Sequence, residues 1–177
     1  MKVDLKGKRA LVGGSSNGIG RAIAERLAAS GAEVVVMARN ESKLREVVAQ
    51  LDYSQGQNHH CLVVDFSDYK AFFKKMNSFF TDHKIDILIN NTQGPAAGSA
   101  LEKEIEEYQD AFDLLFKCAV LSTTLALPHM QEQQWGRIIN VASISVKEPL
   151  NYLVLSNTLR AALVTWAKSL SADIAKD

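Results

Sequence analysis

The sequence of 177 residues has little of what marks several protein classes. Its two cysteines, Cys61 and Cys118, stand in unrelated contexts, which predicts neither a disulfide framework nor a metal knuckle. Its four histidines are dispersed without the spacing of metal ligands, so no metal site is expected. No apolar run reaches the length of a membrane span, and the N-terminus lacks the long apolar segment of a signal peptide. We therefore expect a reduced, cytoplasmic protein.

The charge of the chain has no excess of either sign. Lysine plus arginine and aspartate plus glutamate each number 20. Nucleic acids and membrane surfaces normally attract proteins with a basic excess. The balance therefore argues against both as partners.

Short apolar runs alternate with helical patterns along the whole chain. Five runs predict buried strands: 9–14, 33–38, 60–66, 86–91 and 137–143. These strands are apolar throughout, as expected where helices cover both faces of a parallel sheet. The order predicts a Rossmann-type α/β fold, with a doubly wound parallel sheet in three α/β/α layers. We expect one nucleotide-binding domain over residues 1–177.

The helical periodicity predicts which side chains face the core. Ile19, Ile23 and Leu27 share one face of the first helix, which Gly31 ends, and Asn40 is suited to cap the second helix. The segment 101–130 predicts mostly helix. An apolar stripe marks the last helix: Leu159, Leu163, Trp166, Leu170 and Ile174.

The stretch GGSSNGIG, residues 13–20, joins the first strand to the first helix. In such a turn, Gly14 permits the sharp bend, Gly18 admits a pyrophosphate and Gly20 lets the helix approach the strand. The helix N-terminus adds free N–H groups and a positive dipole end. Three short polar side chains are expected to face the same ligand: Ser15, Ser16 and Asn17. The alternative is a glycine-rich turn without a ligand. The candidate ligand-binding residues here are Gly14, Ser16, Asn17, Gly18, Ile19 and Gly20.

The residues after the second strand bear on which dinucleotide binds. An NAD-selective site usually has an acidic residue there, which hydrogen-bonds the ribose 2′-hydroxyl. This chain has Ala38, Arg39 and Asn40 instead, and a guanidinium can pair with a 2′-phosphate. The pattern favours NADP(H) over NAD(H). The alternative is that Arg39 is only a solvated loop residue.

Three segments together resemble the short-chain dehydrogenase/reductase family. They are the Gly-x-x-x-Gly-x-Gly spacing of residues 14–20, NNTQG at 90–94 and GRIINVAS at 136–143. The nearest subgroup is that of the 3-oxoacyl-[acyl-carrier-protein] reductases. The resemblance implies NAD(P)-dependent hydride transfer to a small carbonyl or alcohol substrate, in a homodimer or homotetramer. It also places Asp65 on the adenine and Asn91 under a ribose, although Thr92 and Gln93 depart from the family pattern.

The same resemblance indicates a changed catalytic site. Ser143 fits the slot of the family's serine, whereas the tyrosine slot holds Ser156 and the lysine slot four residues later holds Arg160. The asparagine slot falls on Leu115. A serine hydroxyl is too weak an acid to replace a phenol, and arginine does not release its proton. Arg160 could still hold a ribose hydroxyl or an anionic substrate, and Tyr152 is a possible replacement acid.

Family members continue beyond the sixth helix with two strands and a substrate-covering loop. We expect the present chain to lack these, which would leave 137–143 as an open, apolar sheet edge. Two functions follow. The first is an NADP(H)-dependent oxidoreductase with altered catalytic residues. The alternative is a catalytically inactive nucleotide-binding or structural homologue.

Overall fold

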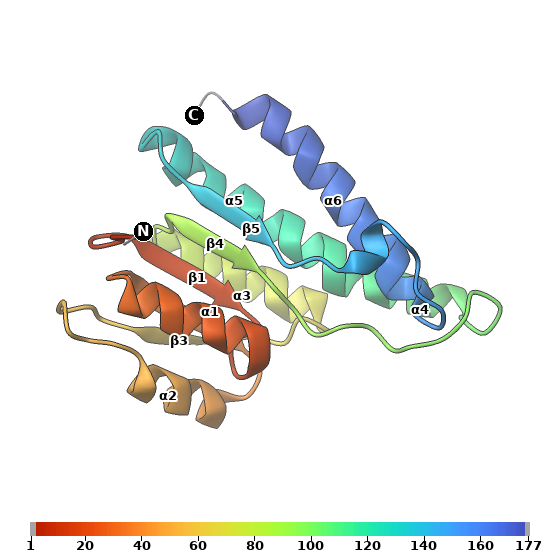
Figure 1. Ribbon diagram of the computed structural model, residues 1–177, viewed down its shortest axis with the longest axis horizontal. Helices are drawn as coiled ribbons and strands as arrows, with labels where there is room; N and C mark the ends of the chain where they lie inside the picture. Colours follow the sequence, from red (N-terminus) through yellow and green to blue (C-terminus); the bar gives the residue numbers. More distant parts are fainter. Residues whose placement is uncertain (1–2, 176–177) are drawn as a thin grey trace.

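A computed structural model describes residues 3–175, two residues short of the predicted domain at each end (Figure 1). Five parallel strands form one sheet in the order β3-β2-β1-β4-β5. The strands are β1 (Arg9–Gly13), β2 (Glu33–Ala38), β3 (His60–Val63), β4 (Ile87–Asn90) and β5 (Arg137–Asn140). The α-helices are α1 (Gly18–Ala29), α2 (Glu41–Gln50), α3 (Tyr69–Asp82), α4 (Ile105–Ala111), α5 (Cys118–Glu132) and α6 (Val154–Ile174). A π-helix, η1 (Phe112–Lys117), joins α4 to α5, and a 3₁₀ turn, η2 (Ile144–Val146), precedes α6.

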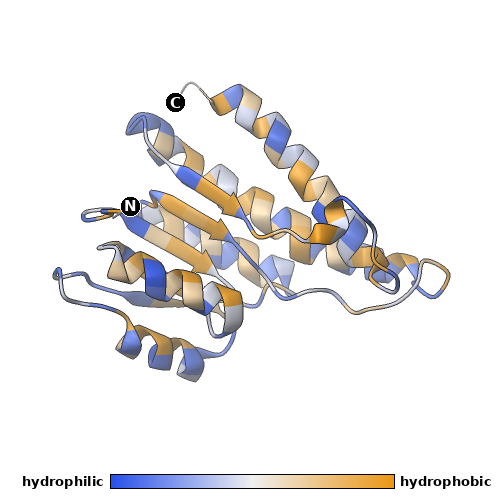
Figure 2. Cartoon of the chain, in the orientation of Figure 1, coloured by the Kyte–Doolittle hydropathy of each residue, from blue (hydrophilic) through white to orange (hydrophobic). Residues whose placement is uncertain are grey.

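Helices cover both faces of the sheet, which confirms the predicted Rossmann-type fold. Alternate residues of β1 and β2, such as Val12 and Val36, pack with α1 and α2. The residues between them, such as Leu11 and Met37, pack with α3, α5 and α6. Both sets are nearly inaccessible to solvent, and β1 and β4 are mostly hydrophobic along their length (Figure 2). β5 lies at one edge of the described sheet, where the sequence predicts an edge.

Two strands end three residues earlier than the sequence predicts. The third was expected to reach residue 66, but the chain turns after Val63 because the Asp65 carboxylate accepts hydrogen bonds from the N–H and hydroxyl of Ser67. The fifth was expected to reach residue 143, but it ends at Asn140, and Ser143 caps η2. One further backbone hydrogen bond follows each strand, from Val64 to Ala38 and from Val141 to Asn90, and local polar turns then take the place of the remaining predicted strand positions.

The buried face of α1 differs from the predicted one. Ile19 is 65% exposed, while Gly20, Ala24 and Ala28 face the core. The reason is the close approach of α1 to β1, since a Cβ at Gly20 would overlap the carbonyl oxygen of Gly14. Small residues are required at that contact, and the larger apolar side chains are displaced to its margins. The cap of α2 is as predicted, because the Lys43 N–H donates to Asn40 Oδ1 over 3.0 Å.

The segment from α4 to α5 forms a continuous helix from Ile105 to Glu132. It is long and apolar enough, by length and composition, to cross a membrane, which the search for apolar runs did not predict. In this structure its apolar residues serve the core. Leu114, Cys118, Ala126 and Met130 are buried over the sheet, where α5 packs on α3 and β4.

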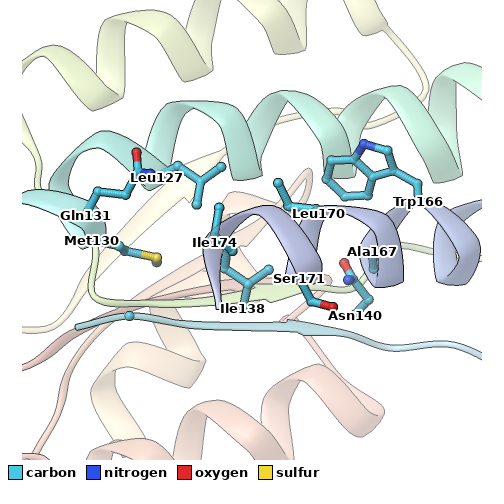
Figure 3. Close-up of a pocket in the computed structure, with 11 residues that line it drawn as sticks. Leu127, Met130, Gln131, Ile138, Asn140, Trp166, Ala167, Leu170, Ser171 and Ile174 are labelled. Carbon is cyan, nitrogen blue, oxygen red and sulfur yellow. The ribbon is translucent and has the colours of Figure 1, made fainter. Parts of the chain in front are cut away.

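The last helix is buried along only half of its predicted stripe. Leu159 and Leu163 are buried, whereas Trp166, Leu170 and Ile174 are half-buried. These three line a cavity of about 190 Å³ between α5, β5 and α6 (Figure 3). The C-terminal half of α6 is therefore less tightly packed than its N-terminal half.

The contact between α1 and β1 gives a test of this packing. Gly20→Ala should lower the free energy of unfolding by about 2 kcal/mol, because overpacking outweighs the roughly 1 kcal/mol that alanine gains in a helix. Gly94→Ala is the control, since a Cβ there meets nothing within 4 Å. Urea denaturation of both variants measures the difference. Equal stability of the two variants would contradict the close approach.

Candidate nucleotide-binding cleft and catalytic slots

A cleft of about 490 Å³ lies at the carboxyl ends of β1, β2 and β4. Ligands of open α/β sheets bind at this edge. The cleft brings together all nine candidate cofactor residues: Gly14, Ser16, Asn17, Gly18, Ile19, Gly20, Arg39, Asp65 and Asn91. Their convergence from four separate segments defines one candidate site.

The glycine-rich turn has the backbone that its sequence requires. Gly14 and Gly18 have φ of +56° and +55°, in the left-handed region that favours glycine. A Cβ at Gly14 would lie 2.7 Å from Asn91 Nδ2, whereas one at Gly18 would meet nothing within 4 Å. The space over Gly18 is therefore open on the side of the cleft.

Two side chains tie this turn to the neighbouring strands. Ser15 is fully buried, and its hydroxyl donates to the Val12 carbonyl and accepts from the Met37 N–H, both over 2.8 Å. Asn91 Nδ2 donates to the Gly13 carbonyl over 3.0 Å. The expectation that Ser15 faces the ligand is thus wrong, because both roles of its hydroxyl are used inside the protein.

The N-terminus of α1 faces the cleft without a side-chain cap. Asn17, the residue before the helix, has extended backbone and makes no capping hydrogen bond, and the first turn contains no acidic residue. The N–H groups and the positive dipole end of a helix are favourable for anions. This part of the cleft can therefore hold a phosphate group.

The end of the cleft next to β2 carries two basic side chains. Arg39 is 61% exposed, and its Nη1 lies 4.0 Å from the Asp65 carboxylate. Hydrogen bonds from Ser67 lower the pKa of Asp65, and Arg39 lowers it further. Lys43 lines the same end of the cleft. The sequence analysis did not include Lys43 among the candidate residues. The predicted cap at Asn40 could have identified it, because that cap places residue 43 in the first turn of α2.

Of the catalytic slots, two come together directly. Arg160 Nε donates to Ser156 Oγ over 3.2 Å, and Arg160 Nη1 donates to the Val141 carbonyl over 2.6 Å. Ser143, two residues beyond Val141, is half-buried, and its hydroxyl accepts from the Ser145 N–H over 3.2 Å. α6 is thereby tied to the end of β5, next to the serine slot.

Leu115, in the asparagine slot, lies in the π-helix and is buried. Its apolar side chain has no group that could relay a proton. It lines a small cavity with Asn91, Thr92 and Arg160, and this cavity shares Asn91 and Thr92 with the large cleft. The structure thus gathers the lysine and asparagine slots at one end of the cleft.

Tyr152 stands on the loop before α6 and is 65% exposed. Its φ is +58°, which is unusual for a residue with a side chain, and its carbonyl accepts from the Gly98 N–H over 2.7 Å. The backbone is fixed by that contact while the phenol is mainly in solvent. This arrangement does not favour Tyr152 as the acid.

The described residues 3–175 contain no group of three or more histidine, cysteine, aspartate or glutamate side chains that could hold a metal ion. One of the dispersed histidines has a structural role. His59 is buried, its Nδ1 accepts from the Val34 N–H over 3.0 Å, and its Nε2 contacts the Asp52 carbonyl at 2.9 Å.

The adjacent serines of the glycine-rich turn should respond differently to substitution. Ser15→Ala should lower the free energy of unfolding by about 1–3 kcal/mol, because it leaves the buried Met37 N–H without that hydroxyl. Ser16→Ala, which removes a hydroxyl from the cleft wall, should change it by less than about 0.5 kcal/mol. Chemical denaturation compares the two. A neutral Ser15→Ala would show that the turn does not depend on this tie.

Comparison with known proteins agrees with this architecture. The family model for short chain dehydrogenases matches residues 8–177. A fatty acyl-CoA reductase of Acinetobacter baylyi is 34% identical over 98% of this chain. A 3-oxoacyl-[acyl-carrier-protein] reductase of Aquifex aeolicus is 28% identical over 99% of it. The chain spans 59% of the length of the first protein and 71% of the second.

Solved structures show the same fold. L-sorbose reductase from Gluconobacter frateurii, complexed with NADPH and L-sorbose, matches with a TM-score of 0.90 and 32% identity, over 99% of this chain and 67% of that one. A 3-oxoacyl (acyl-carrier-protein) reductase from Agrobacterium tumefaciens with NADP bound matches with a TM-score of 0.89 and 27% identity, over 97% and 66%. The chain belongs to the short-chain dehydrogenase/reductase family.

Proposed function

We propose that this chain binds NADP(H) in the cleft and acts as an oxidoreductase on a small carbonyl or alcohol, with altered catalytic residues. The observation that carries the proposal is the cleft itself. The open N-terminus of α1 and Gly18 line one part of it, and Arg39 and Lys43 line the end next to β2. A dinucleotide has a pyrophosphate in its middle and, in NADP(H), a phosphate on the adenosine ribose. These anionic groups match the two cationic features of the cleft.

The preference for NADP(H) over NAD(H) is argued from the charges near β2. Arg39 and Lys43 offer two cations to a 2′-phosphate. The nearby carboxylate of Glu41 is paired with Arg45 over 2.6 Å, so it is drawn to another partner. The Gluconobacter and Agrobacterium reductases, which were solved with NADPH and NADP, support the same choice.

Removal of either cation should weaken the binding of NADPH and leave the binding of NADH unchanged. A charge-assisted hydrogen bond contributes about 1.5–3 kcal/mol, so Arg39→Gln should lower NADPH affinity by about 10–100-fold. Lys43→Gln should lower it by about tenfold, because its ammonium is exposed and hydrated. Energy transfer from Trp135 and Trp166 to the reduced nicotinamide measures binding.

Arg26→Gln is the control for that titration, since it removes a cation from the far end of α1. It should leave both affinities unchanged. If Arg39→Gln weakened NADH as much as NADPH, the proposed preference for the 2′-phosphate would be wrong.

The chemistry available in the catalytic slots limits the reaction. Bound nicotinamide would supply or accept the hydride. Ser143 is proposed to orient the carbonyl oxygen, as in the resemblance to the family. Ser156 accepts a hydrogen bond from Arg160 and is too weak an acid to take the role of a phenol. The proton must therefore come from another source, such as water in the open cleft.

The residues in the catalytic slots favour a second candidate function. With Ser156, Arg160 and Leu115 in the three slots, the chain can keep its nucleotide site and lack hydride transfer altogether. It would then be a nucleotide-binding or structural homologue. Under either function, we propose that the chain is one cytoplasmic nucleotide-binding domain that assembles as a homodimer or homotetramer. This proposal is based on the resemblance to the family.

Turnover separates the two candidates. With an NADPH-consuming substrate in hand, Ser143→Ala should lower kcat by about 100-fold, as for loss of one donor to a developing oxyanion. Tyr152→Phe should leave kcat within twofold, because that phenol is mostly exposed. A large loss with Tyr152→Phe would identify Tyr152 as the acid. Tight NADPH binding without turnover on any aldehyde or ketone would favour the inactive homologue.

A further inference from the structure

Arg160 is a half-buried cation whose hydrogen bonds all go to neutral groups. Its two acceptors are the Ser156 hydroxyl and the Val141 carbonyl. Among residues 3–175, no ion pair involves Arg160. Its charge is therefore without a counter-ion inside the described protein.

Burial lowers the pKa of Arg160, and no carboxylate offsets the effect. The guanidinium is nevertheless charged at neutral pH, because its ordinary pKa is far higher. A charge that is partly removed from water without an opposite charge is unfavourable. The guanidinium has five N–H donors, and the two contacts use two of them. Three donors and one positive charge are thus without a partner among the described residues.

The surroundings of Arg160 would strengthen such a contact. The small cavity beside it has mostly apolar walls, including Leu115 and Leu163. Apart from Arg160, its polar lining residues are neutral: Asn90, Asn91, Thr92 and Ser122. Electrostatic attraction is stronger in such surroundings than in water. The cavity, about 20 Å³, admits only a group of about the size of a water molecule. A single oxygen of an anionic ligand can therefore enter, while the rest of the ligand must lie in the adjoining cleft.

We propose that Arg160 pairs with an anionic oxygen at this end of the cleft, and that the oxygen belongs to the carboxylate of a small oxo or hydroxy acid substrate. This inference rests on the proposed function, because it names the substrate class of the same site. A planar guanidinium matches a carboxylate better than the ammonium of a lysine does. The pyrophosphate of the dinucleotide is the other source of such an oxygen. It is drawn instead to Gly18 and the start of α1, which do not line the cavity of Arg160.

The test compares an acid with its neutral ester on the unaltered protein. The chain is saturated with NADP⁺ and titrated with 2-oxobutanoate and with methyl 2-oxobutanoate, and calorimetry measures both affinities. The acid should bind at least tenfold more tightly than the ester. Equal affinity of the two compounds would overturn the proposal.

Two variants assign the preference to Arg160. Arg160→Gln should lower the affinity for the acid at least tenfold and change the affinities for the ester and for NADPH by no more than about threefold. Arg160→Lys should keep part of the preference for the acid over the ester. If Arg160→Gln weakened NADPH and left the acid preference intact, the oxygen would be that of the cofactor, and the substrate assignment would be wrong. Circular dichroism checks that both variants are folded, and the acid–ester pair on the unaltered chain needs no variant.

The two proposals fail separately. A folded chain that binds neither NADPH nor NADH contradicts the proposed function. The acid–ester comparison on the cofactor-free chain then still decides whether Arg160 selects a carboxylate.

Discussion

The close packing of the first strand–helix turn is the constraint on which the cleft depends. With no Cβ at Gly20, the first turn of α1 lies against the backbone of Gly14. Ser15 then ties the turn to β2, and Asn91 ties it to the end of β4. The helix N-terminus and the carboxyl ends of β2 and β4 are thus fixed relative to one another by backbone and two short side chains. A cleft built in this way needs little rearrangement to accept a ligand, which is the preorganised condition for binding.

The sequence predicted the fold because each level of pattern agreed with the next. Uniformly apolar strands, helical periodicity and a glycine-rich turn all indicated the same doubly wound sheet. The buried face of α1 escaped prediction, since periodicity favours large apolar side chains such as Ile19, whereas close approach selects glycine and alanine. Strand ends escaped it as well, because the Asp65 and Ser143 caps are local and compete with the ladder.

The site was predictable in part for the same reason. Motif spacing brought the candidate cofactor residues together, and Asn40 contained the information that would have added Lys43. The hydrogen-bond partners of Arg160 could not be predicted, because a sequence does not show whether a cation faces a carboxylate or a carbonyl. In the structure, the cleft has one exposed cationic end and one half-buried cationic end. Exposed charges are screened by salt far more than buried ones, so the two ends differ in physical character.

The π-helix η1 has a geometric consequence for everything that follows it. An α-helix turns by about 100° per residue, and a π segment accommodates extra chain within a continuous helix. The face that α5 presents to β4 is therefore set by the wider turns between Phe112 and Lys117. Without them, Ala126 and Met130 would rotate out of the core. The segment that contains Leu115 therefore determines which face of α5 packs against the sheet.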